Sequence, residues 1–422
     1  MEENTEEISL FDLTITQLTK MAKELDIEDY KGLKKNELIH KIFEMQAMQE
    51  GLAFAKGVLE ITDDGYGFLR FKHHNYTHGR NDIYVSSSQI KKFGLKKGHV
   101  VCGPVRAPKE EEKYFALIRV DSINKESPQL AREAKYFDKL TPYYPQEKLD
   151  LETKPTNVTT RIINLFTPIG KGQRGIIVAA PRTGKTVIMQ EIANSVLTNH
   201  KEVYVIVLLV DERPEEVTEM RNILIPENSE VISSTFDETP RNHIQVAEMA
   251  LAKAKRMVEL GHDVVIMLDS ITRLARAYNM VTPSSGKVLS GGLDSSSIHR
   301  PKKFFGSARN TLEQGSLTII ATALVDTGSR MDQVIFEEFK GTGNMELVLD
   351  RSISDLRLYP AIDLVKSGTR REELLLTEEE ANRMFILRKF LKGMSPIQGI
   401  ELLRSKMLKT KNNLELLQIM SK

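Results

Sequence analysis

The sequence contains a single cysteine, Cys102, in 422 residues. One thiol excludes a framework of disulfides within the chain and is typical of a protein from a reducing compartment. No apolar run approaches the length needed to cross a bilayer, and the acidic start lacks the basic flank of a signal peptide. We therefore expect a soluble, cytoplasmic protein that has no membrane partner.

The chain also has almost no net charge, because 59 lysines and arginines are balanced by 58 aspartates and glutamates. Overall charge therefore says nothing about partners, but its distribution is uneven. Residues 1–50 hold 12 acidic and 6 basic side chains, whereas residues 51–121 hold 12 basic and 8 acidic ones. A chain of this length is expected to form two or three domains with a sizeable core.

Residues 179–186, with the sequence AAPRTGKT, have the pattern of a phosphate-binding P-loop. They follow an apolar run at 175–178 and open a stretch of helical composition, so a strand, a loop and a helix are expected in series. Such a loop directs backbone N–H groups and a helix N-terminus at polyphosphate. Lys185 would neutralise the β- and γ-phosphates, and Thr186 would bind Mg²⁺. Ala179 replaces the glycine of the general pattern, and an ordinary glycine-bearing loop is the alternative.

Carboxylates follow two further runs that read as buried strands. Residues 203–210 end at Asp211 and Glu212, and residues 264–268 end at Asp269. Open α/β sheets bind ligands at this edge, so Asp269 is a candidate for holding Mg²⁺ and Glu212 for polarising the attacking water. A third strand is expected at 317–324. The alternative for each carboxylate is a solvated turn residue.

The N-terminal part of the chain has two different periods. Residues 8–49 have helical spacing with a turn near Gly32, which predicts a small helical hairpin whose role is structural or in docking. From residue 57 to residue 120 the period is two, and the turn signals favour a small five-stranded barrel. Residues 126–155 follow as a linker, in which three X-Pro breaks prevent a continuous helix.

Aromatic residues alternate with glycine in the expected barrel. Tyr66 and Phe68 lie two apart around Gly67, and Tyr84 adds another ring from the next strand. We interpret this pattern as a platform for stacking unpaired bases, with Gly67 leaving room for a flat ligand and with Arg70 and Lys72 tracking phosphate. The alternative is that the rings belong to the barrel core.

Four runs together resemble the family of bacterial transcription termination factors Rho, over nearly the whole chain. They are GYGFLR at 65–70, DERPEEVTEM at 211–220, LDSITRLARAYN at 268–279 and EFKGTGNMEL at 338–347. The resemblance implies a ring-forming, RNA-dependent ATPase that binds nascent transcript, moves along it from 5′ to 3′ and dislodges RNA polymerase. Its implied partners are pyrimidine-rich single-stranded RNA, five further copies in a homohexamer, RNA polymerase and elongation factors, and its implied cofactor is Mg²⁺ with ATP.

The same resemblance implies a multi-domain fold. Residues 1–50 would form an N-terminal helical subdomain, 51–125 an RNA-binding β-barrel of the OB or cold-shock type, 126–155 a linker, and 156–422 a RecA-like α/β P-loop ATPase domain.

It also assigns roles to residues in four groups. The catalytic group is Lys185, Glu212, Asp269, Arg370 and Arg357. The ATP-binding group is Gly170, Lys171, Gly172, Gln173, Arg174, Gly175, Arg182, Thr183, Gly184, Lys185, Thr186, Val187, Arg213 and Tyr359, the last as an adenine-stacking ring. The primary RNA group is Gly65, Tyr66, Gly67, Phe68, Leu69, Arg70, Asp82, Ile83, Tyr84, Glu112, Lys113 and Tyr114. The secondary RNA group is Lys287, Val288, Leu289, Ser290, Gly291, Gly292 and Arg330.

Some of these roles have plain alternatives in the sequence. Residues 287–292 are rich in serine and glycine and could be a mobile surface loop without a role. Arg370 is expected to act as a finger on the ATP of a neighbouring subunit, with Arg357 as a second contact across the boundary, but a surface ion pair of Arg370 with Glu372 or Glu373 is the alternative. At the level of the whole chain, the alternatives are a rotary-ATPase catalytic subunit and a passive RNA-binding protein with a vestigial P-loop.

Overall fold

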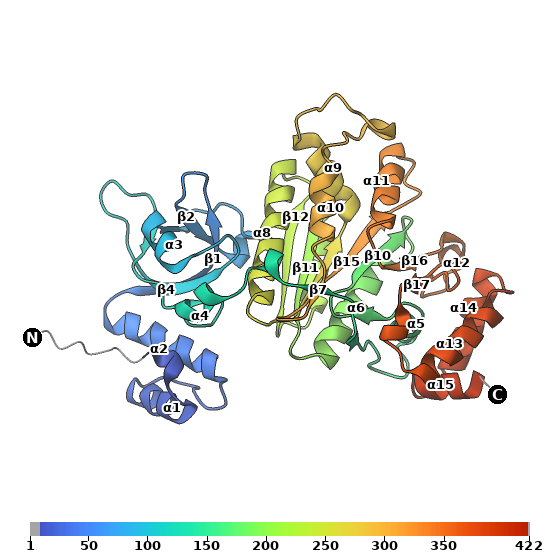
Figure 1. Ribbon diagram of the computed structural model, residues 1–422, viewed down its shortest axis with the longest axis horizontal. Helices are drawn as coiled ribbons and strands as arrows, with labels where there is room; N and C mark the ends of the chain where they lie inside the picture. Colours follow the sequence, from blue (N-terminus) through green and yellow to red (C-terminus); the bar gives the residue numbers. More distant parts are fainter. Residues whose placement is uncertain (1–8, 421–422) are drawn as a thin grey trace, which may run out of the picture. The chain divides into compact units, whose positions relative to one another are not determined.

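The computed structural model describes residues 9–420, which form two compact units (Figure 1). One unit comprises residues 9–136 together with 255–260, and the other comprises 137–254 and 261–420. In the described part of the chain, no helix is both long and apolar enough to cross a membrane.

The first unit begins with a small helical bundle of η1 (Leu10–Asp12), α1 (Ile15–Glu24) and α2 (Lys35–Gln49). A capping box starts α1, because the Thr14 hydroxyl accepts from the N–H of Gln17 and the Gln17 side chain accepts from the N–H of Thr14. Leu18 and Ile42 are fully buried between the two helices. The expected helical hairpin is therefore present.

A β-barrel follows in the same unit. Its elements are β1 (Ala53–Ile61), β2 (Gly67–Arg70), η2 (Lys72–His74), β3 (Ile83–Val85), α3 (Ser87–Phe93), β4 (Val100–Arg106), β5 (Phe115–Leu117), β6 (Ser122–Ile123) and α4 (Pro128–Glu133). Strand β1 pairs with both β2 and β4, so the order β1-β2-β3-β5-β4 closes on itself. Leu59, Leu69 and Val101 fill the interior. The prediction of a five-stranded barrel is confirmed.

The second unit contains a seven-stranded sheet. Its order is β12-β11-β13-β15-β10-β16-β17, and all neighbouring pairs are parallel except β16 with β17. These strands are β10 (Arg174–Ala179), β11 (Tyr204–Glu212), β12 (Ser229–Thr235), β13 (Val264–Asp269), β15 (Leu317–Leu324), β16 (Met345–Val348) and β17 (Gly368–Thr369). The three strands expected at 203–210, 264–268 and 317–324 therefore lie in one parallel sheet, buried on both faces as their apolar runs predict.

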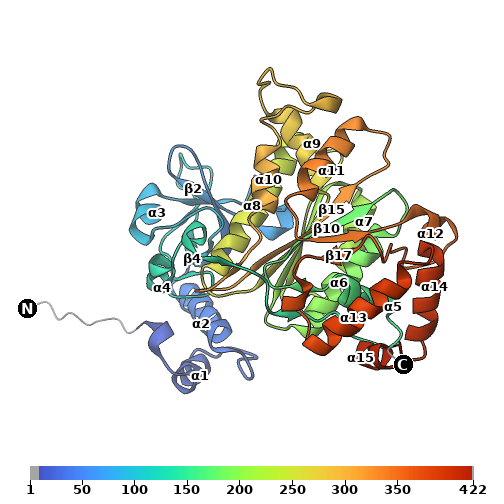
Figure 2. The same ribbon diagram turned by 45° about the vertical axis from the view of Figure 1, so that its right-hand side comes forward.

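Helices and short strands complete the second unit. They are η3 (Phe137–Lys139), β7 (Pro142–Tyr143), β8 (Lys148–Leu149), α5 (Val158–Phe166), β9 (Ile169–Gly170), α6 (Lys185–Asn199), α7 (Pro214–Ile223), α8 (Pro240–Val258, whose residues 255–258 belong to the first unit), α9 (Ile271–Val281), η4 (Ser290–Gly292), α10 (His299–Phe305), β14 (Asn310–Thr311), α11 (Arg330–Lys340), α12 (Arg351–Asp355), η5 (Glu372–Leu374), α13 (Glu378–Leu391), α14 (Pro396–Met407) and α15 (Asn413–Met420). Helices α5, α6 and α13–α15 gather on one side of the unit (Figures 1 and 2), where they share a continuous core with alternate residues of the sheet such as Val205 and Val207. That core fixes α6, and with it the loop that precedes it.

Candidate functional site

The P-loop joins the end of β10 to the start of α6. Arg182 and Gly184 both have a positive φ, of 68° and 87°, and the Thr183 hydroxyl donates to the carbonyl oxygen of Ala180 at 2.7 Å. These features turn the chain sharply back on itself before the helix begins at Lys185. The N-terminus of α6 therefore lies at the carboxyl edge of the sheet, where its free N–H groups can bind an anion.

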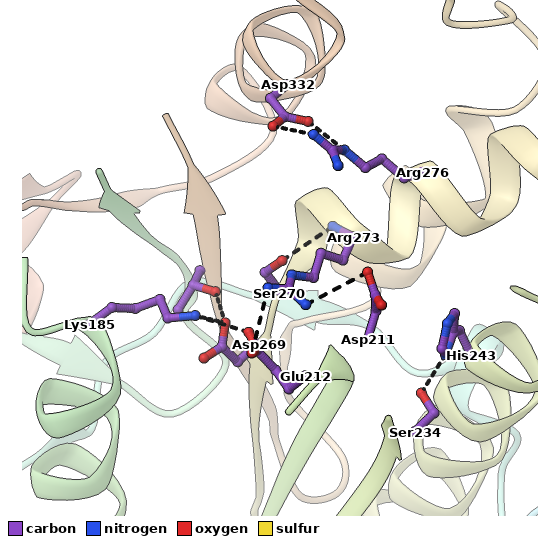
Figure 3. Close-up of polar contacts among 11 residues, drawn as sticks. Lys185, Asp211, Glu212, Ser234, His243, Asp269, Ser270, Arg273, Arg276 and Asp332 are labelled. Carbon is purple, nitrogen blue, oxygen red and sulfur yellow. Dashed lines mark hydrogen bonds and ion pairs between the residues drawn. The ribbon is translucent and has the colours of Figure 1, made fainter. Parts of the chain in front are cut away.

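Lys185 lies between two carboxylates at the ends of neighbouring strands (Figure 3). Its ammonium donates to Asp269 Oδ1 at 2.5 Å and to Glu212 Oε1 at 3.2 Å. Both carboxylates are buried, with relative exposures of 1% for Asp269 and 2% for Glu212. The structure thus brings together Lys185, Glu212 and Asp269, the three residues that sequence reasoning had assigned to the phosphate, the water and the metal.

A bulge sets the direction of Glu212. The pairing of β11 with β12 shifts register between Val210 and Glu212, and the intervening Asp211 has a φ of 58°. A bulge adds one residue to one strand, so the side chain after it points to a different face from the one that regular alternation would give. Glu212 consequently lies beside Asp269, while Asp211 is half-buried and faces Arg273 of α9 with a 3.7 Å separation.

The surroundings shift the pKa values of Glu212 and Lys185. Burial and the neighbouring charge of Asp269 raise the pKa of Glu212 to about 7, although Lys185 and Arg273 oppose the shift. Burial lowers the pKa of Lys185, but Asp269 and Glu212 outweigh it, so the net pKa of Lys185 is raised. The site therefore holds a charged lysine next to a carboxylate that titrates near neutral pH.

Sequence reasoning missed two residues that orient these carboxylates. The Thr322 hydroxyl of β15 donates to Asp269 Oδ1 at 2.7 Å, and the Arg273 guanidinium lies 3.6 Å from Glu212 Oε2. In the sequence, Thr322 stands out only as a threonine inside a largely apolar strand, and Arg273 only as an arginine one helical turn after Asp269. Neither indicates a contact until the strand order is known.

The other residues expected around the P-loop have different surroundings. Arg182, Val187 and Arg213 are exposed, and Arg213 directly follows Glu212 as the N-cap of α7. A methyl group built on Gly184 would lie 3.4 Å from the Tyr359 ring, so Tyr359 touches the P-loop although it is far away in the sequence. The exposed Tyr359 ring is thus placed where a base attached to P-loop phosphates could stack on it.

Residues 170–175 lie elsewhere. They precede β10 and include its first two residues, whereas the P-loop follows its end, so the strand separates Gly175 from Ala179 by roughly 13 Å. Lys171 is buried and pairs with Glu147 at 2.5 Å and with Asp263 at 2.8 Å. In one chain these residues do not share a site with the P-loop, and a nucleotide contact by them stays a prediction.

Arg370 also lies at the amino-terminal edge of the sheet. It follows β17, and its N–H donates to the carbonyl oxygen of Asn344 at 2.8 Å, directly before β16. Its side chain is exposed and forms no ion pair with any residue between positions 9 and 420. Glu373 pairs with Arg371 and Glu372 with Arg388, so the surface ion pair weighed for Arg370 is not formed. Arg357 is exposed and belongs to the same loop as Tyr359.

The loop that contains residues 287–292 contacts the start of α11. A methyl group on Gly291 would lie 2.6 Å from the backbone nitrogen of Met331, next to Arg330. Asp294 orders the loop, because its carboxylate accepts from the N–H groups of Ser285 and Ser296 at 2.7 and 2.8 Å. The segment expected to be mobile is thus held by hydrogen bonds, although residues 287–292 are all exposed. Both views place it at the outer end of α9 and α11 (Figures 1 and 2).

Helix α9 reaches from the carboxylates toward that loop. Arg273 contacts Glu212, and one turn later Arg276 binds Asp332 through two hydrogen bonds of 2.7 and 2.6 Å (Figure 3). Asp332 belongs to the first turn of α11, whose start packs on Gly291. A single helix therefore connects the phosphate site to the exposed loop, which the sequence did not indicate.

Four aromatic rings cluster on one side of the barrel in the first unit. Phe68 lies 4.9 Å from Tyr114, 5.8 Å from Tyr66 and 6.2 Å from Tyr84, measured between ring centroids. All four rings are half-buried, whereas their strand neighbours Leu69 and Ile83 are buried in the barrel core. The rings of this aromatic cluster therefore belong to the surface and the alternate residues to the core, as the period of two predicts.

The structure gives Arg70 and Gly67 different roles from those expected. The Arg70 side chain is buried, binds Glu60 at 2.7 Å and Asp82 more closely, and lies 5.0 Å from the Phe68 ring centre. It supports the ring instead of projecting toward phosphate. A methyl group on Gly67 would lie 2.7 Å from the Glu60 carbonyl oxygen, so this glycine allows close packing against β1.

The segment before β5 contributes one ring and one cation to this side. Tyr114 joins the aromatic cluster, and Lys113 beside it is exposed. Glu112 instead binds Arg106 through two hydrogen bonds of 2.6 and 2.9 Å, which together with the backbone of Lys109 lower its pKa to about 2. Glu112 therefore shapes this turn. Gly65, in the turn before the cluster, has a φ of 85°.

Three family models match the chain. The Rho termination factor N-terminal domain matches residues 9–51, the Rho termination factor RNA-binding domain matches 55–129, and the nucleotide-binding domain of the ATP synthase alpha/beta family matches 159–369. A solved structure described as a prototypical ATPase from the type III secretion system of pathogenic bacteria has a TM-score of 0.57 at 21% identity, covering 76% of this chain and 94% of that chain, and shows the fold alone.

Curated relatives match over almost the full length. Transcription termination factor Rho of Aquifex aeolicus is 55% identical over 97% of this chain and 94% of its own. The Rho proteins of Neisseria gonorrhoeae and Thermotoga maritima are 54% and 51% identical, over 97% and 100% of this chain and 97% and 99% of theirs. An RNA-binding module and an ATPase module in one chain are the parts of an RNA-dependent ATP hydrolase. The chain belongs to the transcription termination factor Rho family.

Proposed function

We propose that the chain is an RNA-dependent ATPase that assembles as a homohexameric ring, follows nascent pyrimidine-rich transcript from 5′ to 3′ and terminates transcription by RNA polymerase. The ATPase activity is supported by one observation: Lys185, at the end of the P-loop, contacts both Glu212 and Asp269. Elongation factors are further partners by the same family relationship.

Glu212 acts as the base in this scheme. Lys185 binds the β- and γ-phosphates from the first turn of α6, and phosphate then competes with Glu212 and Asp269 for its ammonium. A carboxylate with a pKa of about 7 can accept a proton from water near neutral pH more effectively than an ordinary glutamate. Arg273 and the bulge at Asp211 hold that carboxylate in place.

The oxygen donors present fit Mg²⁺. Thr186 is half-buried in the first turn of α6, and its hydroxyl forms no hydrogen bond with the described residues, while Asp269 supplies a carboxylate close by. Mg²⁺ is usually bound by one or two protein oxygens together with substrate phosphates, which agrees with the finding that residues 9–420 contain no cluster of three or more acidic, histidine or cysteine ligands. Bound there, Mg²⁺ would neutralise charge that develops on the phosphates.

Arg370 completes the site of a neighbouring subunit. It lies at the edge of the sheet opposite to the P-loop of its own chain, and the separation along β10 alone exceeds the length of an arginine side chain. An exposed arginine without an ion pair can instead stabilise the γ-phosphate of another chain.

RNA binds at two places in this proposal. The aromatic cluster of Tyr66, Phe68, Tyr84 and Tyr114 stacks on unpaired bases, with Lys113 as the nearby exposed cation. The loop of residues 287–292 with Arg330 forms the secondary, translocating site, and α9 transmits its state to Glu212 through Asp332, Arg276 and Arg273.

Steady-state ATPase activity with and without cytidine-rich RNA tests the proposal. We expect strong stimulation by RNA in the intact chain. Lys185→Ala should abolish turnover but leave RNA binding by the barrel nearly unchanged, because the two sites lie in different units. Hydrolysis that is indifferent to RNA would favour a rotary-type motor, and equal loss of turnover and RNA binding would contradict the modular assignment.

A further inference from the structure

Residues 170–175 lie beside Arg370, and two of them, Gln173 and Arg174, are joined to it by hydrogen bonds through Asn344. We propose that Gln173 and Asn344 are positioning residues. They hold the backbone of Arg370 so that its side chain can contact the nucleotide bound by the neighbouring subunit. This inference rests on the trans role of Arg370 proposed above. It names two residues that act on the reaction through that arginine.

The three glycines of residues 170–175 pack closely against other parts of the same chain. A methyl group on Gly170 would lie 2.7 Å from the side chains of Leu375 and Pro145, and one on Gly172 would lie 2.1 Å from the backbone nitrogen of Asn310. On Gly175 it would lie 2.6 Å from Ile320 Cδ1. Each glycine therefore permits close packing within this chain, and the segment is a fixed support.

Asn344 links this support to the arginine. Its side-chain Oδ1 accepts from Gln173 Nε2 at 2.6 Å and from the N–H of Arg174 at 2.8 Å, and its own N–H donates to the carbonyl oxygen of Arg174 at 2.9 Å. The carbonyl oxygen of Asn344 then accepts from the N–H of Arg370 at 2.8 Å and from Gln173 Nε2 at 3.3 Å. Gln173 and Asn344, which we call the finger clamp, thus connect β10 to Arg370 in two steps.

The other side of Arg370 is anchored as well. The hydroxyl of Thr369 donates to the carbonyl oxygen of Pro168 at 2.8 Å, and Thr369 is buried. Gln173 is only 1% exposed, so water does not compete for its hydrogen bonds. The backbone of Arg370 is therefore fixed on both sides while its side chain is exposed, which is the arrangement expected of a preorganised catalytic arginine.

Arg370 shares a hollow with a second arginine and forms no ion pair among residues 9–420. Arg370 and Arg174 line one hollow of about 260 Å³. Burial, followed by the charges of Arg309 and Arg370, lowers the pKa of Arg174, and no carboxylate in residues 9–420 forms an ion pair with Arg370. The Arg370 guanidinium, exposed and without an ion pair among residues 9–420, is available to a phosphate of the next chain.

Kinetics of the full chain with MgATP and cytidine-rich RNA test the finger clamp. Gln173→Ala and Asn344→Ala should each lower RNA-stimulated kcat by about 10- to 100-fold, the effect of a catalytic group misplaced by about 1 Å, with KM for ATP changed by less than about twofold. Adding Arg370→Ala to either variant should cause no further loss beyond that of Arg370→Ala alone, because the clamp acts only through Arg370. Arg371→Ala is the matched control, since Arg371 pairs with Glu373 and stacks on Tyr144 without contacting Asn344.

The outcomes separate this inference from the proposed function. If Arg370→Ala keeps its kcat, the trans role fails and the finger clamp fails with it. If Arg370→Ala loses activity but the clamp variants keep theirs, or if the losses in the double variants add up, Gln173 and Asn344 do not position Arg370. Failure of both clamp variants to fold or to assemble would show a purely structural role and would overturn the inference. When only one of them fails, the other decides.

Discussion

Glu212, the base in our proposal, has a pKa that is set by its neighbours. Burial beside Asp269 disfavours its charged form, whereas Lys185 and Arg273 favour it, and the balance leaves a pKa of about 7. Each neighbour also contacts a second partner, because Arg273 faces Asp211 and Lys185 is shared with Asp269. A change in any of these contacts alters the ability of Glu212 to accept a proton.

The pH dependence of hydrolysis should reveal this balance. Glu212 must be ionised to polarise water, so kcat/KM for ATP should rise with pH and level off above about 7. Arg273→Gln removes a cation that lowers the pKa of Glu212, so the rising limb should move to higher pH. If the rising part of the pH profile does not move in Arg273→Gln, the titrating group belongs to the substrate or to another residue.

Glu212→Gln should bind ATP and lose hydrolysis.

Phe68 should contribute to RNA affinity as a stacking residue. Phe68→Ala should weaken binding of single-stranded pyrimidine RNA by roughly 1 to 3 kcal/mol, the value of one lost base stack, measured by fluorescence anisotropy. Phe115→Ala is the control, because Phe115 is an exposed aromatic next to Tyr114 that points to the other side of its strand. Loss of barrel structure by circular dichroism in Phe68→Ala would show instead that this ring stabilises the fold.

Single elements of the second unit connect distant parts of the sequence. Ser270 follows directly after the strand that ends in Asp269. It is the N-cap of helix α9, and its hydroxyl accepts from the N–H of Arg273. Its two arginines then contact Glu212 and Asp332. Movement of the loop against α11 would therefore reach the base through one helix, without a change in the sheet.

Two glycine substitutions in the same loop test that connection. Gly291 and Gly286 have similar φ values, 78° and 75°, so an alanine at either position costs roughly 1 to 3 kcal/mol of backbone strain. Only at position 291 would the new methyl group meet the backbone of Met331, at 2.6 Å, since nothing lies within 4 Å at position 286. RNA stimulation of ATPase activity should fall further in Gly291→Ala than in Gly286→Ala, and primary RNA binding should be unchanged in both. Equal stimulation in the two variants would argue against a role for the contact with α11.

Several helices and strands could be predicted from the spacing of apolar residues, because buried positions recur at a regular interval along each strand and helix. The hairpin, the five-stranded barrel and the strands ending at Glu212 and Asp269 were all predicted in this way. The bulge at Asp211 and the contact of Thr322 with Asp269 could not be predicted, because they depend on the pairing of strands that are far apart in the chain. Arg70 was expected to track phosphate, and its side chain is buried with Glu60 and Asp82. A strand pattern does not show which charges pair across it.

At the scale of the whole molecule, our proposal requires two chains to form one complete active site. The P-loop, Glu212 and Asp269 lie at the carboxyl edge of the sheet, whereas Arg370 lies at the opposite edge. A finger at that edge can act only on nucleotide bound by another copy. Assembly is therefore a requirement of the chemistry in our proposal.

Mixing two inactive variants provides that test. Arg370→Ala should lower RNA-stimulated ATPase activity by roughly 10³- to 10⁵-fold, the range for arginine fingers, with little change in ATP affinity. Lys185→Ala loses the phosphate contact but retains Arg370. In mixed rings, some interfaces combine an intact Lys185 of one chain with an intact Arg370 of the next, so hydrolysis should reappear. Single-turnover conditions are needed, because continuous turnover could require every subunit of the ring to be active, and subunit exchange must be verified in the same mixture by energy transfer between labelled chains. If exchanged rings hydrolyse no more ATP than either parent, Arg370 does not act across a subunit boundary, and the residue that stabilises the transition state must be sought on the P-loop side, where Arg182 and Arg213 are exposed.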